Sequence, residues 1–127
     1  MRIIIIDDDE DFLEIMNTRL KKEGYEVSSL ISGSGLRGEV CEFNPDLVIT
    51  DILMPGITGA YVYEEIRKIC GPDMPVIVST ATRMKLKHIK DDFLEYCPKP
   101  VDFDKLFETI QRLVSLSQEP KNNNSTQ

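Results

Sequence analysis

Short apolar runs rich in β-branched residues alternate along the chain with segments whose apolar residues recur at helical spacing. The strand-like runs are residues 3–6, 25–31, 47–50, 76–80 and 93–97. The first is apolar at every position, which is typical of a strand buried on both faces of a parallel sheet. Five strand–helix units in one chain predict an α/β fold, with a single doubly wound five-stranded parallel sheet and helices on both faces.

The helix-like segments follow each strand in turn. The first carries Phe12 on its apolar stripe and stops near Gly24, and a weaker helix is expected over residues 33–43. Thr58 is placed to cap a third helix. Residues 82–94 are expected to be helical at least in part, and Asp102 precedes the clearest amphipathic helix of the chain.

Composition limits the classes of function. A chain of 127 residues has room for one domain, expected over residues 1–117, with a polar and disordered tail over 118–127. The net charge of -7 argues against binding of nucleic acid and favours a site for cations. No apolar run is long enough for a signal peptide or a membrane span, and three scattered cysteines indicate neither a disulfide framework nor a zinc site. We therefore expect a cytoplasmic protein that does not contact the membrane.

Polar residues follow the strands where each strand ends. Asp7, Asp8 and Asp9 follow the first strand, Asp51 the third, Thr80 closes the fourth and Lys99 comes after the fifth. Parallel strands bring their carboxyl ends to one edge of the sheet, where ligands of such folds bind. Carboxylates gathered there repel one another unless a cation neutralises them, and oxygen ligands with completing waters are the pattern of Mg²⁺.

A lysine, a hydroxyl and a divalent cation around one carboxylate form a site for a phosphoryl group carried by that carboxylate. In this interpretation Asp51 is the nucleophile. Each feature alone has an ordinary explanation: an acidic run is typical of a helix start, Asp51 suits a turn before Pro55, and Thr80 is a common strand residue. Their occurrence at successive strand ends favours the joint interpretation.

With these residues in place, the sequence resembles the CheY-like receiver domain of two-component response regulators. The resemblance covers residues 1–116 and rests on four segments: IIIIDDD (3–9), LVITDILMPGITG (47–59), PVIVSTA (75–81) and Lys-Pro (99–100). It implies a (βα)5 flavodoxin-like receiver fold. It also implies a phosphorylation-switched signalling domain of a two-component system, rather than an enzyme, capable at most of self-phosphorylation from small donors and of autodephosphorylation.

The resemblance assigns a role to each matching position. Asp51 corresponds to the phosphoacceptor, which takes its phosphoryl group from the phosphohistidine of a histidine kinase. Asp8, Asp51 and the backbone carbonyl of Leu53 correspond to direct Mg²⁺ ligands, with Asp7 assisting through water. Lys99 corresponds to the residue that contacts the phosphoryl oxygens.

The switch positions are implied in the same way. Thr80 would swing in to hydrogen-bond a phosphoryl oxygen, and Ala81 is the small residue that lets its backbone N–H reach that group. Tyr96 matches the aromatic position that turns inward when the hydroxyl residue moves, although a half-buried strand aromatic is an equally ordinary interpretation. The resemblance also implies a cis peptide bond between Lys99 and Pro100.

The resemblance further implies partners: a sensor histidine kinase or phosphotransfer protein as donor, and a downstream effector protein or an output domain as receiver. It also allows a homodimer. Two departures from the family pattern bear on this. The segment between Thr80 and Lys99 is about one helical turn shorter than usual, which puts a standard dimer through the fourth-helix region in doubt. Pro98 is expected to distort the fifth strand and the presentation of Lys99.

Three other functions compete with this interpretation. Gly33, Gly35 and Gly38 fit the G-x-G-x-x-G pattern of a dinucleotide-binding turn, but they follow the second strand instead of the first. A Mg²⁺-dependent phosphatase with an aspartyl-phosphate intermediate would need a second aspartate where Leu53 stands. A phosphorylation-independent interaction domain would have little need to retain the acidic residues and Lys99.

Overall fold

The computed structural model describes residues 1–54, 57–82 and 89–119, with the side chains of 53–59 left aside. Its helices and strands follow one another along the chain as β1 (Arg2–Ile6), α1 (Glu10–Lys22), β2 (Glu26–Leu30), α2 (Leu36–Phe43), β3 (Leu47–Thr50), β4 (Leu53–Met54), β5 (Ile57–Thr58), α3 (Gly59–Cys70), β6 (Val76–Val78), β7 (Leu94–Tyr96) and α4 (Phe103–Gln118).

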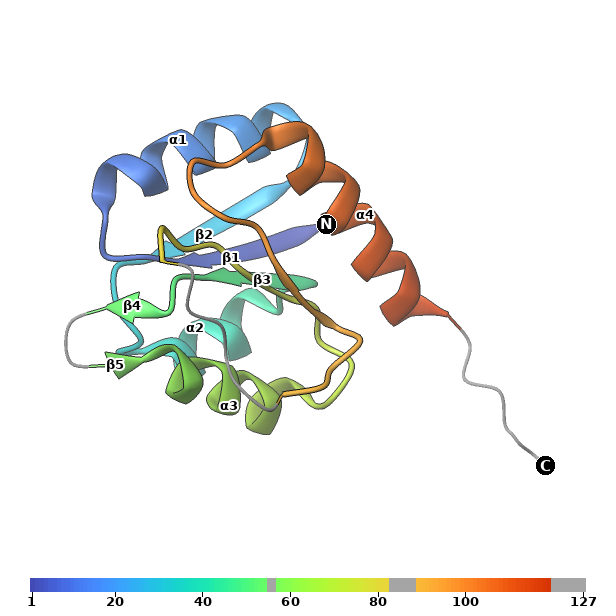
Figure 1. Cartoon of the computed structure of the whole chain (residues 1–127). Coiled ribbons are helices and arrows are strands. Elements are labelled where there is room, and N and C mark those ends of the chain that lie inside the picture. The colour runs from blue at the N-terminus through green and yellow to red at the C-terminus, as the bar shows by residue number, and fades with distance from the viewer. Residues whose placement is uncertain (55–56, 83–88, 120–127) are drawn as a thin grey trace.

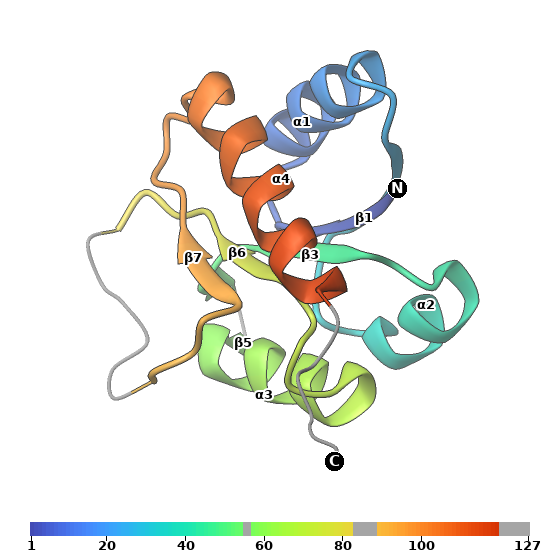
Figure 2. The same ribbon diagram turned by 90° about the vertical axis from the view of Figure 1, so that its right-hand side faces the viewer.

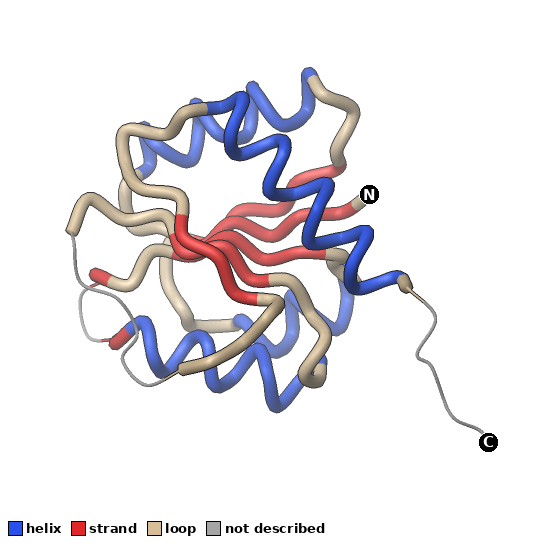
Figure 3. The backbone as a smooth tube through the Cα atoms, turned by 45° about the vertical axis from the view of Figure 1, so that its right-hand side comes forward, coloured by secondary structure: helices blue, strands red, loops and turns tan. Residues whose placement is uncertain are grey.

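Five of the strands form one sheet in the order β2-β1-β3-β6-β7, and every neighbouring pair runs parallel. Figure 3 shows this sheet as a central layer with helices above and below it. The α/β fold with a five-stranded parallel sheet, predicted from the sequence, is confirmed. The remaining two strands, β4 and β5, pair with each other in an antiparallel hairpin that was not predicted.

The alternation of side chains along β1 explains why its whole sequence is apolar. Ile3 and Ile5 belong to the core cluster that α1 and α4 cover, whereas Ile4 and Ile6 belong to the cluster beneath α2 and α3. Figure 2 shows these two pairs of helices on opposite faces of the sheet. All four isoleucines have no exposed surface. A strand between two helix layers must be apolar at every position, because neither face meets water.

The ends of the helices follow from local side-chain chemistry. The side chain of Asp9 caps α1 by accepting the backbone N–H of Phe12, and Asp102 caps α4 by accepting that of Lys105. Gly24 adopts a φ of 94° just after α1, a conformation that costs glycine nothing and so ends the helix. The predicted cap at Asp102 and the predicted stop at Gly24 are confirmed.

The described residues of the connection between β6 and β7 lie at the two ends of the stretch 82–94, which was predicted to be helical at least in part. Of that stretch, Thr82 and residues 89–93 are not helical, and residues 83–88 lie outside the described part. The reason is visible at Asp91, whose carboxylate accepts the backbone N–H of Phe93 at 2.8 Å. A short acidic side chain that bonds the backbone two residues ahead stabilises a turn in competition with a helix. The described residues therefore contain four helices, not five.

Two side chains of α3 also bind Asp91. The guanidinium of Arg67 donates to Asp91 Oδ2 at 2.7 and 3.0 Å, and the hydroxyl of Tyr63 donates to the same oxygen. Arg67 also donates to the backbone carbonyl of Met74 at 2.7 Å. These contacts fix the segment before β7 against α3 without an intervening helix in the described residues.

The C-terminal boundary is only partly described. Helix α4 ends at Gln118, the first residue of the predicted polar tail, and residues 120–127 lie outside the described part. The division into residues 1–117 and 118–127 stays a prediction. None of the described helices combines the length and the apolar character needed to cross a membrane.

Candidate functional site

Backbone hydrogen bonds continue past the strand ends and carry four polar positions to one edge of the sheet. Asp7 donates its N–H to Leu30 at 3.0 Å, and Asp51 donates to Ile6 at 3.1 Å. Lys99 donates its N–H to the carbonyl of Thr80 at 3.0 Å. The carboxyl ends of the strands lie at the left of Figure 1, where β4 and β5 also lie. The polar residues that were predicted to share this edge do share it.

The side chain of Lys99 joins two of the predicted acidic residues. Its Nζ lies 2.7 Å from Oδ2 of Asp7 and 3.0 Å from Oδ2 of Asp51. Asp7 is 1% exposed and Asp51 is 7% exposed, so both contacts are shielded from water. The other oxygen of Asp7 accepts the backbone N–H of Asp9 at 2.9 Å. One ammonium group thus holds together two carboxylates that come from different strands.

Burial and ion pairing have opposite effects on the pKa of Asp7, and likewise on the pKa of Lys99. Burial raises the pKa of Asp7 above its ordinary 3.8, although the hydrogen bonds from Lys99 and Asp9 oppose this. For Lys99, burial by itself would lower the pKa, but the hydrogen bonds to Asp7 and Asp51 raise it above 10.5. The carboxylate of Asp7 is buried more deeply than the ammonium, so it loses more hydration when charged.

Asp8 completes a group of three carboxylates. One carboxylate oxygen from each of Asp7, Asp8 and Asp51 lies within 4.8 Å of the others, and Asp8 is exposed while the other two are buried. Octahedral ligands of Mg²⁺ stand about 2.1 Å from the ion, so opposite ligands are about 4.2 Å apart. The limit of 4.8 Å is slightly wider than that span, so the group would need to close a little, or one carboxylate would act through water, and the purely oxygen donor set is the type that Mg²⁺ prefers. An open, exposed side at Asp8 leaves room for waters and for a phosphoryl group.

Phe12 is a residue at this site that the sequence did not single out. Its ring centroid lies 4.1 Å from Nζ of Lys99. In the sequence Phe12 is one member of the apolar stripe of the first helix, and no local signal distinguishes it from the core residues that follow. Only the approach of α1 to the chain after β7 shows that the ring meets an ammonium group.

Thr80 lies at the same edge with its side chain enclosed. It is 4% exposed, and its Oγ1 accepts the backbone N–H of Thr82 at 3.3 Å. Ala81, between them, is exposed. The backbone of Leu53 lies in β4, two residues beyond Asp51. The roles assigned to Thr80, Ala81 and the Leu53 carbonyl stay predictions.

Pro98 does not interrupt the backbone pairing that carries Lys99 to the edge of the sheet. Cys97 donates its N–H to Val78 at 2.8 Å, and Lys99 donates to Thr80 at 3.0 Å, so the ladder continues on both sides of the proline. In a parallel pair, alternate residues point their N–H groups to alternate sides. Because β7 is the edge strand, the N–H that Pro98 lacks would have pointed away from the sheet. The peptide bond between Lys99 and Pro100 is cis, as predicted.

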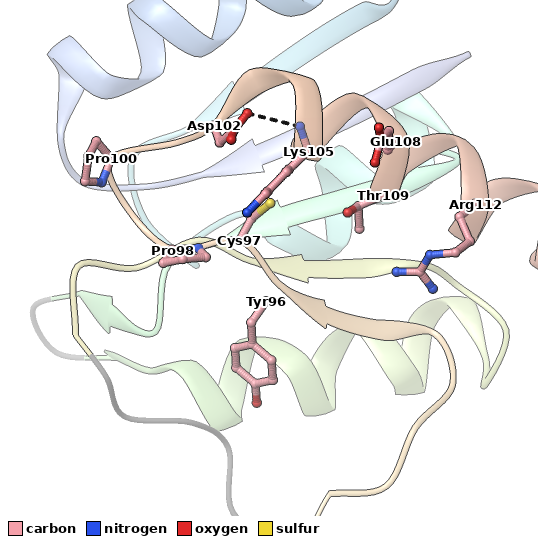
Figure 4. Close-up of a pocket in the computed structure, with 9 residues that line it drawn as sticks. All are labelled: Tyr96, Cys97, Pro98, Pro100, Asp102, Lys105, Glu108, Thr109 and Arg112. Atoms are coloured by element: carbon pink, nitrogen blue, oxygen red, sulfur yellow. Dashed lines mark hydrogen bonds between the residues drawn. The ribbon is translucent and has the colours of Figure 1, made fainter.

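Tyr96 is half-buried at the end of β7. Figure 4 shows its ring on the α3 side of the sheet, whereas the thiol of Cys97 points toward α4. Tyr96, Pro98 and Pro100 line a pocket of about 510 Å³, whose α4 side is formed by Lys105, Thr109 and Arg112 among others. The predicted switch position therefore lies beside a surface hollow that adjoins the Lys99 segment.

The family model of the response regulator receiver domain matches residues 3–111. The chain belongs to the response regulator receiver domain family. Among curated relatives, it is 31% identical over 120 residues to the transcriptional regulatory protein ZraR of Salmonella typhimurium, an alignment that covers 92% of this chain. The chain spans only 27% of the length of that relative.

Solved receiver structures share the fold. The response regulator TrrA of Thermotoga maritima, solved in complex with Mg(2+)-BeF, is 37% identical with a TM-score of 0.76, covering 88% of this chain and 97% of that one. A CheY-like receiver domain protein of Methanospirillum hungatei is 29% identical with a TM-score of 0.80, covering 92% and 95%. The family predicted from the sequence is confirmed, and this chain is a receiver domain of the two-component type.

The glycines that suggested a dinucleotide site lie elsewhere. Gly35, with a φ of 78°, precedes α2, and the motif follows β2 at the outer edge of the sheet. The acidic cluster lies instead after β1 and β3. Gly35 is accounted for by the positive φ of the turn into a short helix.

Proposed function

We propose that Asp51 is the phosphoacceptor of this receiver domain and that it takes its phosphoryl group from a histidine kinase or a phosphotransfer protein. The observation that carries the proposal is the Lys99 ammonium bridging Asp51 and Asp7, within a cluster of three carboxylates at the carboxyl edge of the sheet. This arrangement places a nucleophile, a fixed positive charge and oxygen ligands for a cation around one point.

The reaction is an in-line displacement at phosphorus. A carboxylate oxygen of Asp51 forms the new P–O bond while the P–N bond of the donor phosphohistidine breaks, and the imidazole nitrogen keeps the electron pair. No general base is needed, because the carboxylate attacks in its ionised form. Asp51 is a nucleophile that is used once per signal, which is the behaviour of a signalling domain and not of a turnover enzyme.

The cluster binds Mg²⁺ in this proposal, through Asp8, Asp51 and the carbonyl of Leu53, with Asp7 acting through water. When bound, the ion offsets the negative charge that spreads over the transferring phosphoryl oxygens. Lys99 contacts one of these oxygens, and its short bond to Asp7 keeps it at the site before the donor arrives. In this proposal the N–H of Ala81 and the hydroxyl of Thr80 donate hydrogen bonds to the other phosphoryl oxygens.

The readout is proposed to run from Thr80 to the surface around Tyr96. Thr80 is bonded through its backbone to Lys99. Lys99 lies between Pro98 and Pro100, which both line the pocket wall, and the chain then continues into α4. A change in the Thr80 side chain upon phosphorylation is therefore adjacent to a surface that an effector protein, an output domain or a second copy of the chain can bind. This is a population shift between two surfaces, biased by the phosphoryl group.

The test is the mass of the intact protein after incubation with acetyl phosphate and Mg²⁺. One phosphoryl adduct is expected, and it should disappear with a chelator and in Asp51→Asn. Asp11→Asn removes an exposed carboxylate of α1 and serves as the matched control that keeps the adduct. An adduct that persists in Asp51→Asn would overturn the assignment. Sustained turnover of p-nitrophenyl phosphate would favour the phosphatase.

A further inference from the structure

The aromatic contact of Lys99 sets it apart from a lysine held only by carboxylates. Two of its N–H groups point to Asp7 and Asp51, and the face of the Phe12 ring lies 4.1 Å from Nζ. Attraction between an ammonium and a ring face is significant within about 6 Å of the centroid. The side chain of Lys99 is 17% exposed. It is therefore enclosed by two carboxylates and one aromatic ring.

A closed series of contacts connects the Phe12 ring to Lys99 and Asp7. Asp7 accepts the backbone N–H of Asp9 through Oδ1, and Asp9 accepts the backbone N–H of Phe12 through its own Oδ1. Phe12 faces Lys99, and Lys99 returns to Asp7 through Oδ2. The turn from β1 into α1 thus fixes the backbone of Phe12 relative to the carboxylate that Lys99 binds.

We propose that Phe12 is a positioning residue for phosphoryl transfer, which keeps the Lys99 ammonium at the site when its carboxylate partners are engaged elsewhere. The inference rests on the proposed function of Asp51. Phe12 does not contact the reacting atoms and acts only through Lys99.

The physical reason is competition for the same carboxylates. A divalent cation on the acidic cluster and a phosphoryl group on Asp51 both engage carboxylates that Lys99 now contacts. Each also changes the electrostatic pull on the ammonium. The ring face is a partner that neither of them can take, and its attraction is broad enough to tolerate a small shift of Nζ toward the phosphoryl oxygens.

The experiment replaces Phe12 site-specifically with mono-, di- and trifluorophenylalanine in the full chain. Fluorination keeps the size of the ring nearly constant and removes negative charge from its face, so it weakens the cation contact stepwise. The rate of phosphorylation by acetyl phosphate in Mg²⁺ should fall about three- to tenfold across the series. In Phe12→Leu the phosphorylation rate should fall at least as far, and in Phe12→Tyr it should be retained.

Phe103 offers a matched control in the same chain. The guanidinium carbon of Arg19 lies 4.1 Å from the Phe103 ring centroid, the same distance in the same kind of contact, but between α1 and α4 and without a contact to the acidic cluster. The fluorinated series at Phe103 should leave the rate unchanged. A flat rate across the Phe12 series, or an equal decrease at Phe103, would overturn the positioning role.

A second measurement needs neither metal nor activity. In the metal-free protein, ring current should shift the Hε protons of Lys99 upfield, and Phe12→Leu should abolish that shift. Lys99 resonances that do not change in Phe12→Leu would overturn the contact itself. If the wild-type chain forms no adduct, Asp51 as phosphoacceptor fails, whereas an adduct without dependence on ring fluorination defeats only the role of Phe12.

Discussion

Lys99 and Asp7 are 92 positions apart in the chain, yet the ammonium of one donates to Oδ2 of the other at 2.7 Å. Asp7 directly follows β1, and Lys99 lies beyond the edge strand β7. The contact between them therefore crosses the carboxyl edge of the sheet. Asp51 lies between them and takes the second bond from the same ammonium. Asp7, the more deeply buried of the two carboxylates, therefore makes the shorter contact with the Lys99 ammonium.

Removing the ammonium should leave buried carboxylates without a counter-charge. Lys99→Met keeps most of the length of the side chain, and we expect it to abolish phosphorylation and to lower the free energy of unfolding at neutral pH by about 3 kcal/mol. Urea unfolding measures the second effect. Adding Asp7→Asn to Lys99→Met should recover much of the stability, and equal costs with and without that second change would contradict the pairing. Lys105→Met, an exposed lysine, is the control.

Addition of Mg²⁺ should stabilise the folded protein, because the ion relieves repulsion among Asp7, Asp8 and Asp51. At about 100 times its dissociation constant the gain is about 2.7 kcal/mol, measured as a saturable rise in Tm that a chelator reverses. Asp8→Asn should weaken the response, whereas Asp11→Asn should keep it. A rise of equal size in Asp8→Asn would place the ion elsewhere.

Asp91 should contribute stability that is lost in acid. Burial alone would raise its pKa, but the hydrogen bonds from Tyr63, Arg67 and the N–H of Phe93 bring the pKa below 3.8. A carboxyl with a lowered pKa in the folded state stabilises above the unfolded value and loses that contribution as pH falls through the folded one. Asp91→Asn should therefore cost about 1–3 kcal/mol at neutral pH. The difference should shrink below pH 3.8.

Urea unfolding of wild type and Asp91→Asn at pH values above and below 3.8 tests this prediction. Asp92→Asn, at an exposed neighbouring residue, is the control. A difference between wild type and Asp91→Asn that grows on acidification would show that the sign is wrong.

Helix α4 should be held mainly by its buried face. Ile110 has no exposed surface and belongs to the cluster with Ile3 and Ile5. Ile110→Ala should cost about 2–5 kcal/mol in unfolding free energy, measured by chemical denaturation. Gln111→Ala, one residue on and exposed, should change stability little. Similar costs at the two positions would mean that the packing of α4 is not what secures it.

The cap of α4 should matter through its oxygen and not its charge. Asp102 accepts the N–H of Lys105 at 3.2 Å. Asp102→Ala removes the acceptor and should cost about 1 kcal/mol, whereas Asp102→Asn keeps an acceptor and should cost less. Thermal unfolding of the pair gives the comparison. If Asn is as damaging as Ala, the charge at the helix terminus is the dominant contribution.

The sheet, the chain positions at its carboxyl edge and the members of the acidic group could all be predicted from the sequence. Those features follow from local patterns: β-branched runs, helical spacing and polar residues directly after strands. The stop at Gly24 and the cap at Asp102 were equally local, because each is decided by contacts within a few residues.

The contacts between elements that are distant along the chain emerged only from the packing of the layers. It placed the ring of Phe12 on Lys99, held the turn at Asp91 through Arg67, and turned the missing N–H of Pro98 outward from an edge strand. The spacing of residues reports which side of its own element a side chain occupies. It does not report which atom of another element will lie opposite, because that depends on how the layers pack.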